Sequence, residues 1–200
     1  MVGLLGPNGA GKTTMIRAIA GRVALDSGSI QLFGRTVTAR DPRPEIGVVP
    51  QELAVYSLLT ARENLAFFAG LGGVADPAAA AALALSRAGL ADRADDPVSS
   101  FSRGMRQRVA LERALIHAPR LVLLDEPFTG LDDASTAMLV ARLQGLRDDG
   151  AIVIVATHDL DLAEGLLDHA LFLRDGRVVE SLARPEALRA RYRALMSRSQ

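Results

Sequence analysis

The segment GPNGAGKTT, residues 6–14, limits the possible folds of this chain more than any other stretch. It holds the only lysine of 200 residues, because the other 22 basic positions are all arginine. Gly6-x4-Gly11-Lys12-Thr13 is the P-loop pattern, and it lies between an apolar run that predicts a strand and a predicted helix. Its glycines let successive backbone N–H groups turn toward one point and cradle phosphate oxygens. The pattern predicts a triphosphate site formed by Gly6, Pro7, Asn8, Gly9, Ala10, Gly11, Lys12, Thr13 and Thr14.

The lone lysine has a physical explanation in the shape of its head group. A lysine ammonium is a compact point charge that can reach the β- and γ-phosphates inside such a loop, whereas the planar arginine fork has a different shape. Arginine has taken every position where charge alone matters, and Lys12 marks the place where shape matters too.

Composition excludes several classes of protein. The formal net charge is zero, so no basic footprint favours a nucleic-acid partner. The absence of cysteine excludes a disulfide framework and a thiolate metal site. Apolar runs are interrupted by glycine, aspartate and proline before they reach the roughly 20 residues of a membrane span.

The order of predicted elements indicates an α/β fold. Apolar strands over residues 2–5, 121–127 and 151–158 alternate with helices over residues 13–20, 134–147 and 159–167, which favours a mostly parallel sheet flanked by helices. Shorter patterns predict a hairpin over residues 29–37 around a Gly34-Arg35 turn, helix starts at Thr60 and Asp76, a helix over residues 103–117 and a final arginine-rich helix from Pro185. We therefore expect one domain, residues 1–200, with a P-loop NTPase core over about 1–51 and 118–200 and an inserted helical lobe over about 52–117.

Two carboxylates follow the buried strand of the segment LVLLDEP. The carboxyl end of a parallel strand is where an open α/β sheet binds its ligands. Asp125 is placed to hold Mg²⁺ together with the Thr13 hydroxyl, and Glu126 is then free to orient and deprotonate an attacking water.

Three further signals are weaker when each is taken alone. Ser102, followed by Gly104, begins a helix whose N–H groups can bind an anion, although ordinary N-capping explains a serine there equally well. Gln51 follows a strand and can reach a metal ion or the water, or is simply solvated. His158 ends a buried strand, where an imidazole can contact a γ-phosphate or serve a structural role.

These motifs, in this order from residue 1 to about residue 180, resemble the nucleotide-binding subunit of ABC transporters. The resemblance identifies residues 6–14 as Walker A, Gln51 as the Q-loop, Asp125 and Glu126 as Walker B, Asp132 as part of the D-loop and His158 as the switch histidine. It identifies Ser102, Arg103, Gly104 and Met105 as the signature. It implies catalytic roles for Lys12, Gln51, Glu126 and His158, and Mg²⁺ ligation by Thr13, Gln51 and Asp125. In this family two copies pair head to tail around ATP.

The chain departs from the family pattern in two places. The usual Ser-Gly-Gly-Gln core reads Ser102-Arg103-Gly104-Met105, which is similar to the version in exporter-type ATPases. The strands and the adenine-stacking aromatic that normally precede Walker A are absent from the 200 residues, so we expect weakened nucleotide affinity.

The resemblance implies an ATPase, using ATP and Mg²⁺, that drives export through a separately encoded transmembrane permease. It implies pairing with a second nucleotide-binding domain, as a homodimer or heterodimer, at the cytoplasmic face of the membrane. The closest similarity is to the haem-exporter ATPase of cytochrome c maturation. Drug or polysaccharide export, a soluble non-transport ATPase and a subunit that binds ATP without turnover stand as alternatives, and the transported substrate stays open.

Overall fold

The computed structural model describes residues 1–196, and these form two compact units. The first unit consists of residues 1–43, 123–126 and those from 152 onward. The second consists of residues 44–122 and 127–151. The predicted division into a P-loop core and a helical lobe stays a prediction, and each unit is described by itself.

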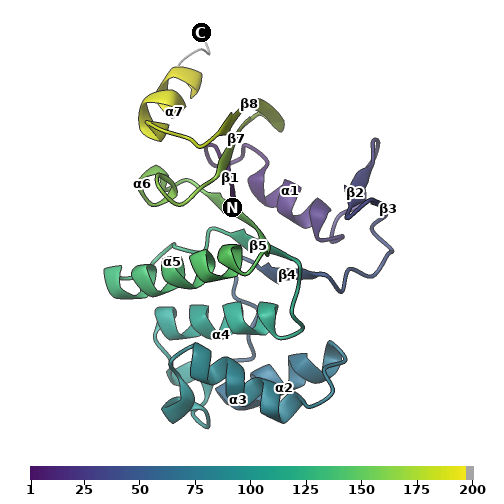
Figure 1. The fold of residues 1–200 in the computed structure, drawn as a ribbon, viewed down its shortest axis with the longest axis vertical. Helices are drawn as coiled ribbons and strands as arrows, with labels where there is room; N and C mark the ends of the chain where they lie inside the picture. The colour runs from purple at the N-terminus through teal and green to yellow at the C-terminus, as the bar shows by residue number, and fades with distance from the viewer. Residues whose placement is uncertain (197–200) are drawn as a thin grey trace. The chain divides into compact units, whose positions relative to one another are not determined.

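A mostly parallel sheet forms the centre of the first unit (Figure 1). The strands of this unit follow the order β5-β6-β1-β7-β8. Only the second half of β5 (Leu121–Asp125) belongs to the unit. Strand β1 (Val2–Leu5) pairs in parallel with β6 (Ile152–Thr157) and with β7 (His169–Arg174), and β7 pairs antiparallel with β8 (Arg177–Ala183). Leu5 lies opposite Thr157, so the segments that follow β1 and β6 leave the sheet at the same edge. This confirms the predicted α/β class.

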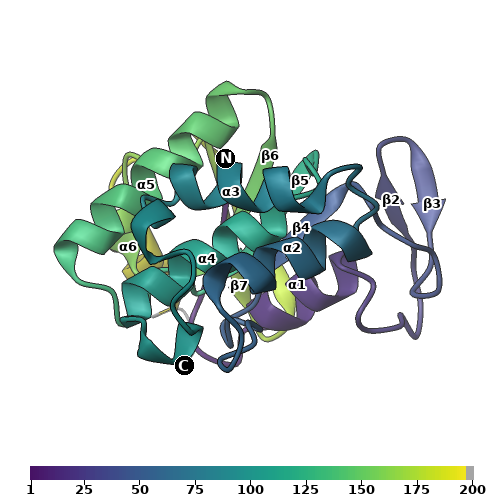
Figure 2. The same cartoon turned by 90° about the horizontal axis from the view of Figure 1, so that it is seen from below.

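Three helices and a hairpin complete the first unit. Helix α1 (Lys12–Ile19) follows the P-loop, α6 (Leu160–Ala163) follows β6, and α7 (Leu188–Met196) lies near the end of the described chain. The hairpin of β2 (Ile30–Leu32) and β3 (Arg35–Val37) stands beside the C-terminal end of α1 (Figure 2). The last four residues of the predicted arginine-rich helix, 197–200, lie outside the described part.

Two local predictions for this unit were wrong. The hairpin turns at Phe33 and Gly34, which both have positive φ, instead of at Gly34 and Arg35. The helix expected over residues 159–167 is a single turn, because Gly165 takes a φ of 84° that no α-helix accommodates.

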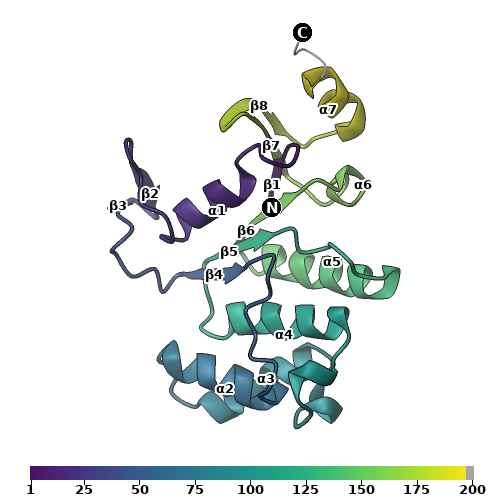
Figure 3. The ribbon, with the colours of Figure 1, turned by 180° about the vertical axis from the view of Figure 1, so that it is seen from behind.

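Helices dominate the second unit, as Figure 3 shows. Helix α4 (Arg103–Leu115) lies between α5 (Asp133–Asp148) and the pair α2 (Ala61–Leu71) and α3 (Pro77–Arg87). Two short 3₁₀ turns, η1 (Ala91–Arg93) and η2 (Val98–Ser100), precede α4. Strand β4 (Ile46–Val49) belongs to this unit, and the N–H groups of Arg120 and Leu121 donate to the Glu45 carbonyl.

The core of this unit explains why its helices form. Thr60 and Glu63 make the predicted capping box at the start of α2, and Asp76 caps α3 with Pro77 in its first turn. The apolar faces of the helices then share one buried cluster, which comprises Ala61, Leu65, Ala81, Ala84, Leu85, Ala88, Leu90, Ala94, Val98, Phe101 and Val109. None of the helices in residues 1–196 combines the length and the apolar character that crossing a membrane requires.

Candidate functional site

The P-loop of the first unit presents backbone N–H groups in a conformation that only glycine adopts easily. Gly9 and Gly11 have φ values of 81° and 100°, in the left-handed region. Gly6 is fixed by a different constraint, because a Cβ there would lie 2.4 Å from the Leu173 carbonyl oxygen. Helix α1 begins directly after Gly11 without a side-chain cap. Its first N–H groups are therefore free of side-chain acceptors and can bind an anion.

Lys12 is buried at the centre of this loop, with 6% of its surface exposed. Its Nζ donates to the carbonyl oxygens of Gly6 at 2.7 Å and Pro7 at 3.2 Å. The Glu126 carboxylate lies 3.7 Å from the same nitrogen. The ammonium group is thus surrounded by three oxygen atoms.

Asp125 lies at the end of β5, where the Thr13 hydroxyl donates to its carboxylate at 3.1 Å. Burial raises the pKa of Asp125, and the Thr13 hydrogen bond opposes part of that shift. Two adjacent oxygen donors suit a hard divalent cation such as Mg²⁺. Among residues 1–196 no group of three or more acidic, His or Cys side chains is arranged to hold a metal ion by itself. A cation here would complete its coordination with ligand oxygens and water.

Glu126 follows Asp125 with a φ of 50°, and its N–H donates to the Ala156 carbonyl at 2.8 Å. One oxygen of its carboxylate accepts a 2.8 Å hydrogen bond from His158 Nδ1, and the other lies 3.7 Å from the Lys12 Nζ. The Glu126 side chain is 11% exposed and that of His158 is 58% exposed. Five predicted residues, Lys12, Thr13, Asp125, Glu126 and His158, therefore meet at one edge of the sheet.

The predicted residues of the P-loop belong to the first unit, and the remaining ones, Gln51, Ser102–Met105 and Asp132, belong to the second unit. Ser102 caps α4, and its Oγ accepts the Met105 N–H at 3.2 Å. Asp132 caps α5 by accepting the Ser135 N–H at 2.7 Å. The segments predicted to be the signature and the D-loop thus lie at two helix N-termini of this unit, and each of these ends is capped by a side chain.

Gln51 is exposed and follows β4. The segment after it is held by Arg113 of α4, whose guanidinium donates to the carbonyls of Val48 and Ala54 and lies 5.0 Å from the Phe68 ring centroid. Tyr56, Phe67 and Phe68 pack their rings together, with centroids 5.3 to 5.8 Å apart. We name these three residues the aromatic patch; Tyr56 and Phe67 are each about half exposed.

Sequence reasoning missed several residues that shape this unit. Arg113, Glu112 and Arg142 carry charges at buried or partly buried positions, and the bond of the predicted residue Arg103 to the Thr129 carbonyl was not expected. A charged residue inside an apolar helical pattern, as at Glu112 and Arg113, is the signal that could have indicated the first two. Arg142 and the partner of Arg103 leave no local signal.

Comparisons with known proteins point to one family. A family model described as "ABC transporter" matches residues 1–129. The linearmycin resistance ATP-binding protein of Bacillus subtilis is 40% identical over 182 residues, which cover 88% of this chain and 58% of that protein. The Nod factor export ATP-binding protein I of Burkholderia orbicola is 40% identical over 190 residues, which cover 93% and 62%. The chain thus spans less than two thirds of the length of these curated relatives.

A solved structure matches the fold over nearly the whole chain. The dimeric ATP-binding cassette MJ0796, solved with ADP and phosphate, superposes with a TM-score of 0.83 at 28% identity. The match covers 93% of this chain and 86% of the other.

Proposed function

The chain belongs to the ABC transporter family, and we propose that it is the ATP-hydrolysing component of an exporter whose membrane-spanning part is a separate chain. The observation that carries the proposal is the position of the Glu126 carboxylate between Lys12 and His158. In this arrangement a phosphate-binding cation and a base contact each other directly when no nucleotide separates them.

ATP binding follows from the geometry of the P-loop. The N–H groups of residues 9–14 surround the β- and γ-phosphates at the start of α1, and the Lys12 ammonium turns from its carbonyl acceptors toward the phosphate oxygens. Phosphoryl transfer needs stabilisation of charge on the γ-phosphoryl oxygens, and the Lys12 ammonium supplies a positive charge for it.

Hydrolysis requires a water molecule in line with the bond that breaks. We assign Glu126 as the general base: its carboxylate accepts the water proton while the water oxygen bonds to the γ-phosphorus and the bond to the β-phosphate oxygen breaks, giving ADP and phosphate. His158 holds the carboxylate through Nδ1 and, being more than half exposed, can turn its ring toward the γ-phosphate.

Thr13 and Asp125 are the residues that would hold Mg²⁺, with Gln51 as a further ligand proposed from the family motif. When bound, the ion neutralises charge on the β- and γ-phosphate oxygens. The partly buried Asp125 carboxylate, whose pKa is raised by burial, gains a partner for its charge in that state.

We further propose that two copies enclose each ATP. The Ser102 hydroxyl accepts a hydrogen bond from the Met105 N–H, so its own proton stays available to donate to a γ-phosphate held by the other copy. Arg103, Gly104 and Met105 supply the first turn of the same helix, and Asp132 lies at the start of α5. The dimeric state of the cassette MJ0796, solved with ADP and phosphate, supports this arrangement.

We propose that the aromatic patch binds the membrane-spanning partner. Its rings form an exposed apolar surface beside the segment that follows Gln51, and Leu58 in the same segment is 89% exposed. Exposed clustered aromatic side chains are characteristic of binding surfaces. A permease bound there would place the chain at the cytoplasmic face of a membrane.

The transported substrate is the most specific element of the proposal. The printed names of two relatives, for Nod factor export and linearmycin resistance, support the exporter class. Nothing in the site or in these names singles out haem. Export of haem, of a drug or of a saccharide therefore remain competing hypotheses that only the permease can decide.

Glu126→Gln tests the proposed chemistry. The amide keeps the shape of the side chain but cannot accept the water proton, so turnover should fall by about two to three orders of magnitude while ATP binding persists. Without hydrolysis the two-copy complex should accumulate, and size-exclusion chromatography with light scattering will measure it. Asp159→Asn makes the same carboxylate-to-amide change at the N-cap of α6, where asparagine can still cap the helix, and is the matched control. Unchanged turnover in Glu126→Gln would remove Glu126 from the base role.

A further inference from the structure

The second residue of the signature segment departs from the family pattern, which has glycine where this chain has Arg103. The structure gives this side chain a definite partner. Its Nε donates to the carbonyl oxygen of Thr129 at 2.6 Å. A Cβ placed on Gly130 would lie 2.9 Å from the same Nε, so glycine leaves the space that the guanidinium occupies. A glycine at position 103 could make no such bond.

Gly104, the next residue along α4, is also closely packed in this region. A Cβ on Gly104 would lie 2.2 Å from the Ser135 Oγ, so the first turns of α4 and α5 are in close contact. Ser135 also donates its N–H to Asp132, and the Thr136 N–H donates to the Asp132 carbonyl. The loop of residues 129–132, which we name the D-loop segment, is thus bonded to α5 at one end and to Arg103 at the other.

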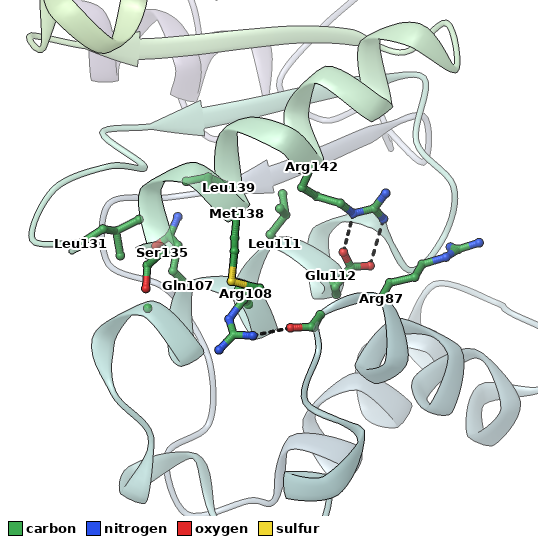
Figure 4. A pocket seen from close by; sticks show the side chains of 12 residues that line it. Arg87, Gln107, Arg108, Leu111, Glu112, Leu131, Ser135, Met138, Leu139 and Arg142 are labelled. Carbon is green, nitrogen blue, oxygen red and sulfur yellow. Dashed lines mark hydrogen bonds and ion pairs between the residues drawn. The ribbon is translucent and has the colours of Figure 1, made fainter. Parts of the chain in front are cut away.

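A pocket continues from this contact along the interface of α4 and α5 (Figure 4). Ser135 and Leu131 line one end, and the Glu112–Arg142 ion pair lies toward the other end. Gln107 projects into it with its amide nitrogen unpartnered and only 3% of the residue exposed. Packing along the middle of this interface is therefore incomplete, and the polar contacts at its ends acquire more importance for holding the two helices in register.

We propose that Arg103 is a positioning residue that ties the signature turn to the D-loop segment, so that Ser102 and Asp132 face a second copy as one preformed surface. This inference rests on the proposed two-copy arrangement. The bond spans residues 26 apart in the sequence and joins the two motifs directly. Without the Arg103 bond, the D-loop segment would have to become ordered when the second copy binds. The free energy of that ordering would weaken association.

The test uses Arg103→Ala, Arg103→Lys and the control Arg106→Ala, which removes the same charge from an exposed position of α4. Hydrogen exchange of residues 129–136 is measured on the nucleotide-free chain. ATP-dependent dimerisation is then measured in the Glu126→Gln background, together with binding of a fluorescent ATP analogue to the monomer. Because Arg103 is exposed, its replacement should leave the fold intact.

We expect Arg103→Ala to accelerate exchange in the D-loop segment and to weaken dimerisation by about fivefold, the loss expected for one charge-assisted hydrogen bond at a surface. Affinity of the monomer for the ATP analogue should not change, and Arg103→Lys should restore part of both effects through its remaining donor. Exchange and dimerisation in Arg103→Ala equal to those in Arg106→Ala would overturn the proposal. If Glu126→Gln alone stays monomeric with ATP, the two-copy arrangement is wrong, and unchanged exchange in Arg103→Ala would still reject the tie independently.

Discussion

Helices α1 and α4 both begin at a proposed phosphate-binding motif, but their N-termini are completed in opposite ways. Helix α1 starts after Gly11, in a left-handed conformation and without a side-chain cap. Helix α4 starts after Ser102, whose hydroxyl already accepts an N–H of the first turn. Helix α5, beside α4, is capped in the same way by Asp132. The N-terminus of α1 is therefore open to a ligand, whereas at the N-terminus of α4 a side chain already accepts an N–H of the first turn.

The charged groups near these two helix ends also differ in whether they are arranged around a ligand site or between parts of the chain. In the first unit Glu126 contacts both Lys12 and His158, the groups to which we assign ligand binding and catalysis. In the second unit the polar contacts of Arg103 and Glu112 join α4 to the loop before α5 and to α5 itself. The comparison indicates that the first unit carries the reactive groups and the second supplies a prearranged surface. Substitutions should then change ligand binding in the first unit and stability in the second.

Lys12→Arg should give the largest effect on ligand binding. The Nζ lies among the Gly6 and Pro7 carbonyls and the Glu126 carboxylate, and the planar guanidinium fork has a different shape from this compact point charge. We expect ATP affinity to fall by about a hundredfold, which corresponds to about 2.7 kcal/mol, as measured by titration calorimetry. The urea midpoint should change little. Arg17→Lys, on the exposed side of the same helix, preserves the charge and should bind ATP as the natural chain does.

An arginine at position 12 that bound ATP normally would show that charge alone suffices in the loop. The survival of a single lysine among 23 basic residues would then need another cause.

Arg142→Met should affect stability instead of binding. Glu112 is 3% exposed and accepts two hydrogen bonds from the Arg142 guanidinium, at 2.7 and 3.2 Å. Removing the arginine leaves a buried carboxylate without its cation, so urea unfolding should show a loss of about 3 kcal/mol. The double variant with Glu112→Leu should recover much of that loss. Arg147→Met removes a more exposed pair with Asp148 and should cost less than about 1 kcal/mol.

The sequence predicted the first unit's site better than the arrangement of the second. Walker A and the carboxylates of β5 lie within short segments whose conformation follows from local rules, such as glycine at positive φ and acidic residues at a strand end. The contacts of Arg103 with Thr129 and of Glu112 with Arg142 join residues 26 and 30 apart. Tertiary packing sets such contacts, and no local pattern encodes them. Helix α6 is shorter than the predicted helix over residues 159–167, and Gly165 at positive φ lies just beyond its end.

The smallest predicted effects concern two aspartates whose pKa values shift in opposite directions. Burial raises the pKa of Asp125, whereas hydrogen bonds from Ser135 lower the pKa of Asp132. Just above pH 3.8, the ordinary value for both, the folded chain holds more protons at Asp125 than the unfolded chain does. Asp125 therefore costs stability as pH rises through its folded pKa. Asp132 contributes stability above pH 3.8 and loses it as pH falls through its folded pKa.

Asparagine at each position should separate these contributions in chelator-treated, nucleotide-free protein. Asp125→Asn should raise the urea midpoint at pH 7, and the difference from the natural chain should shrink as pH falls toward 3.8, because the carboxylic acid is then neutral in both states. Asp132→Asn keeps the helix cap, since asparagine caps as well as aspartate. It should lower the midpoint at pH 7 and match the natural chain only well below pH 3.8. The contrast is between a carboxylate of the first unit that is kept for a ligand at a cost in stability and one of the second unit that stabilises its own helix. If both variants shifted the midpoint in the same direction at pH 7, this contrast would be wrong.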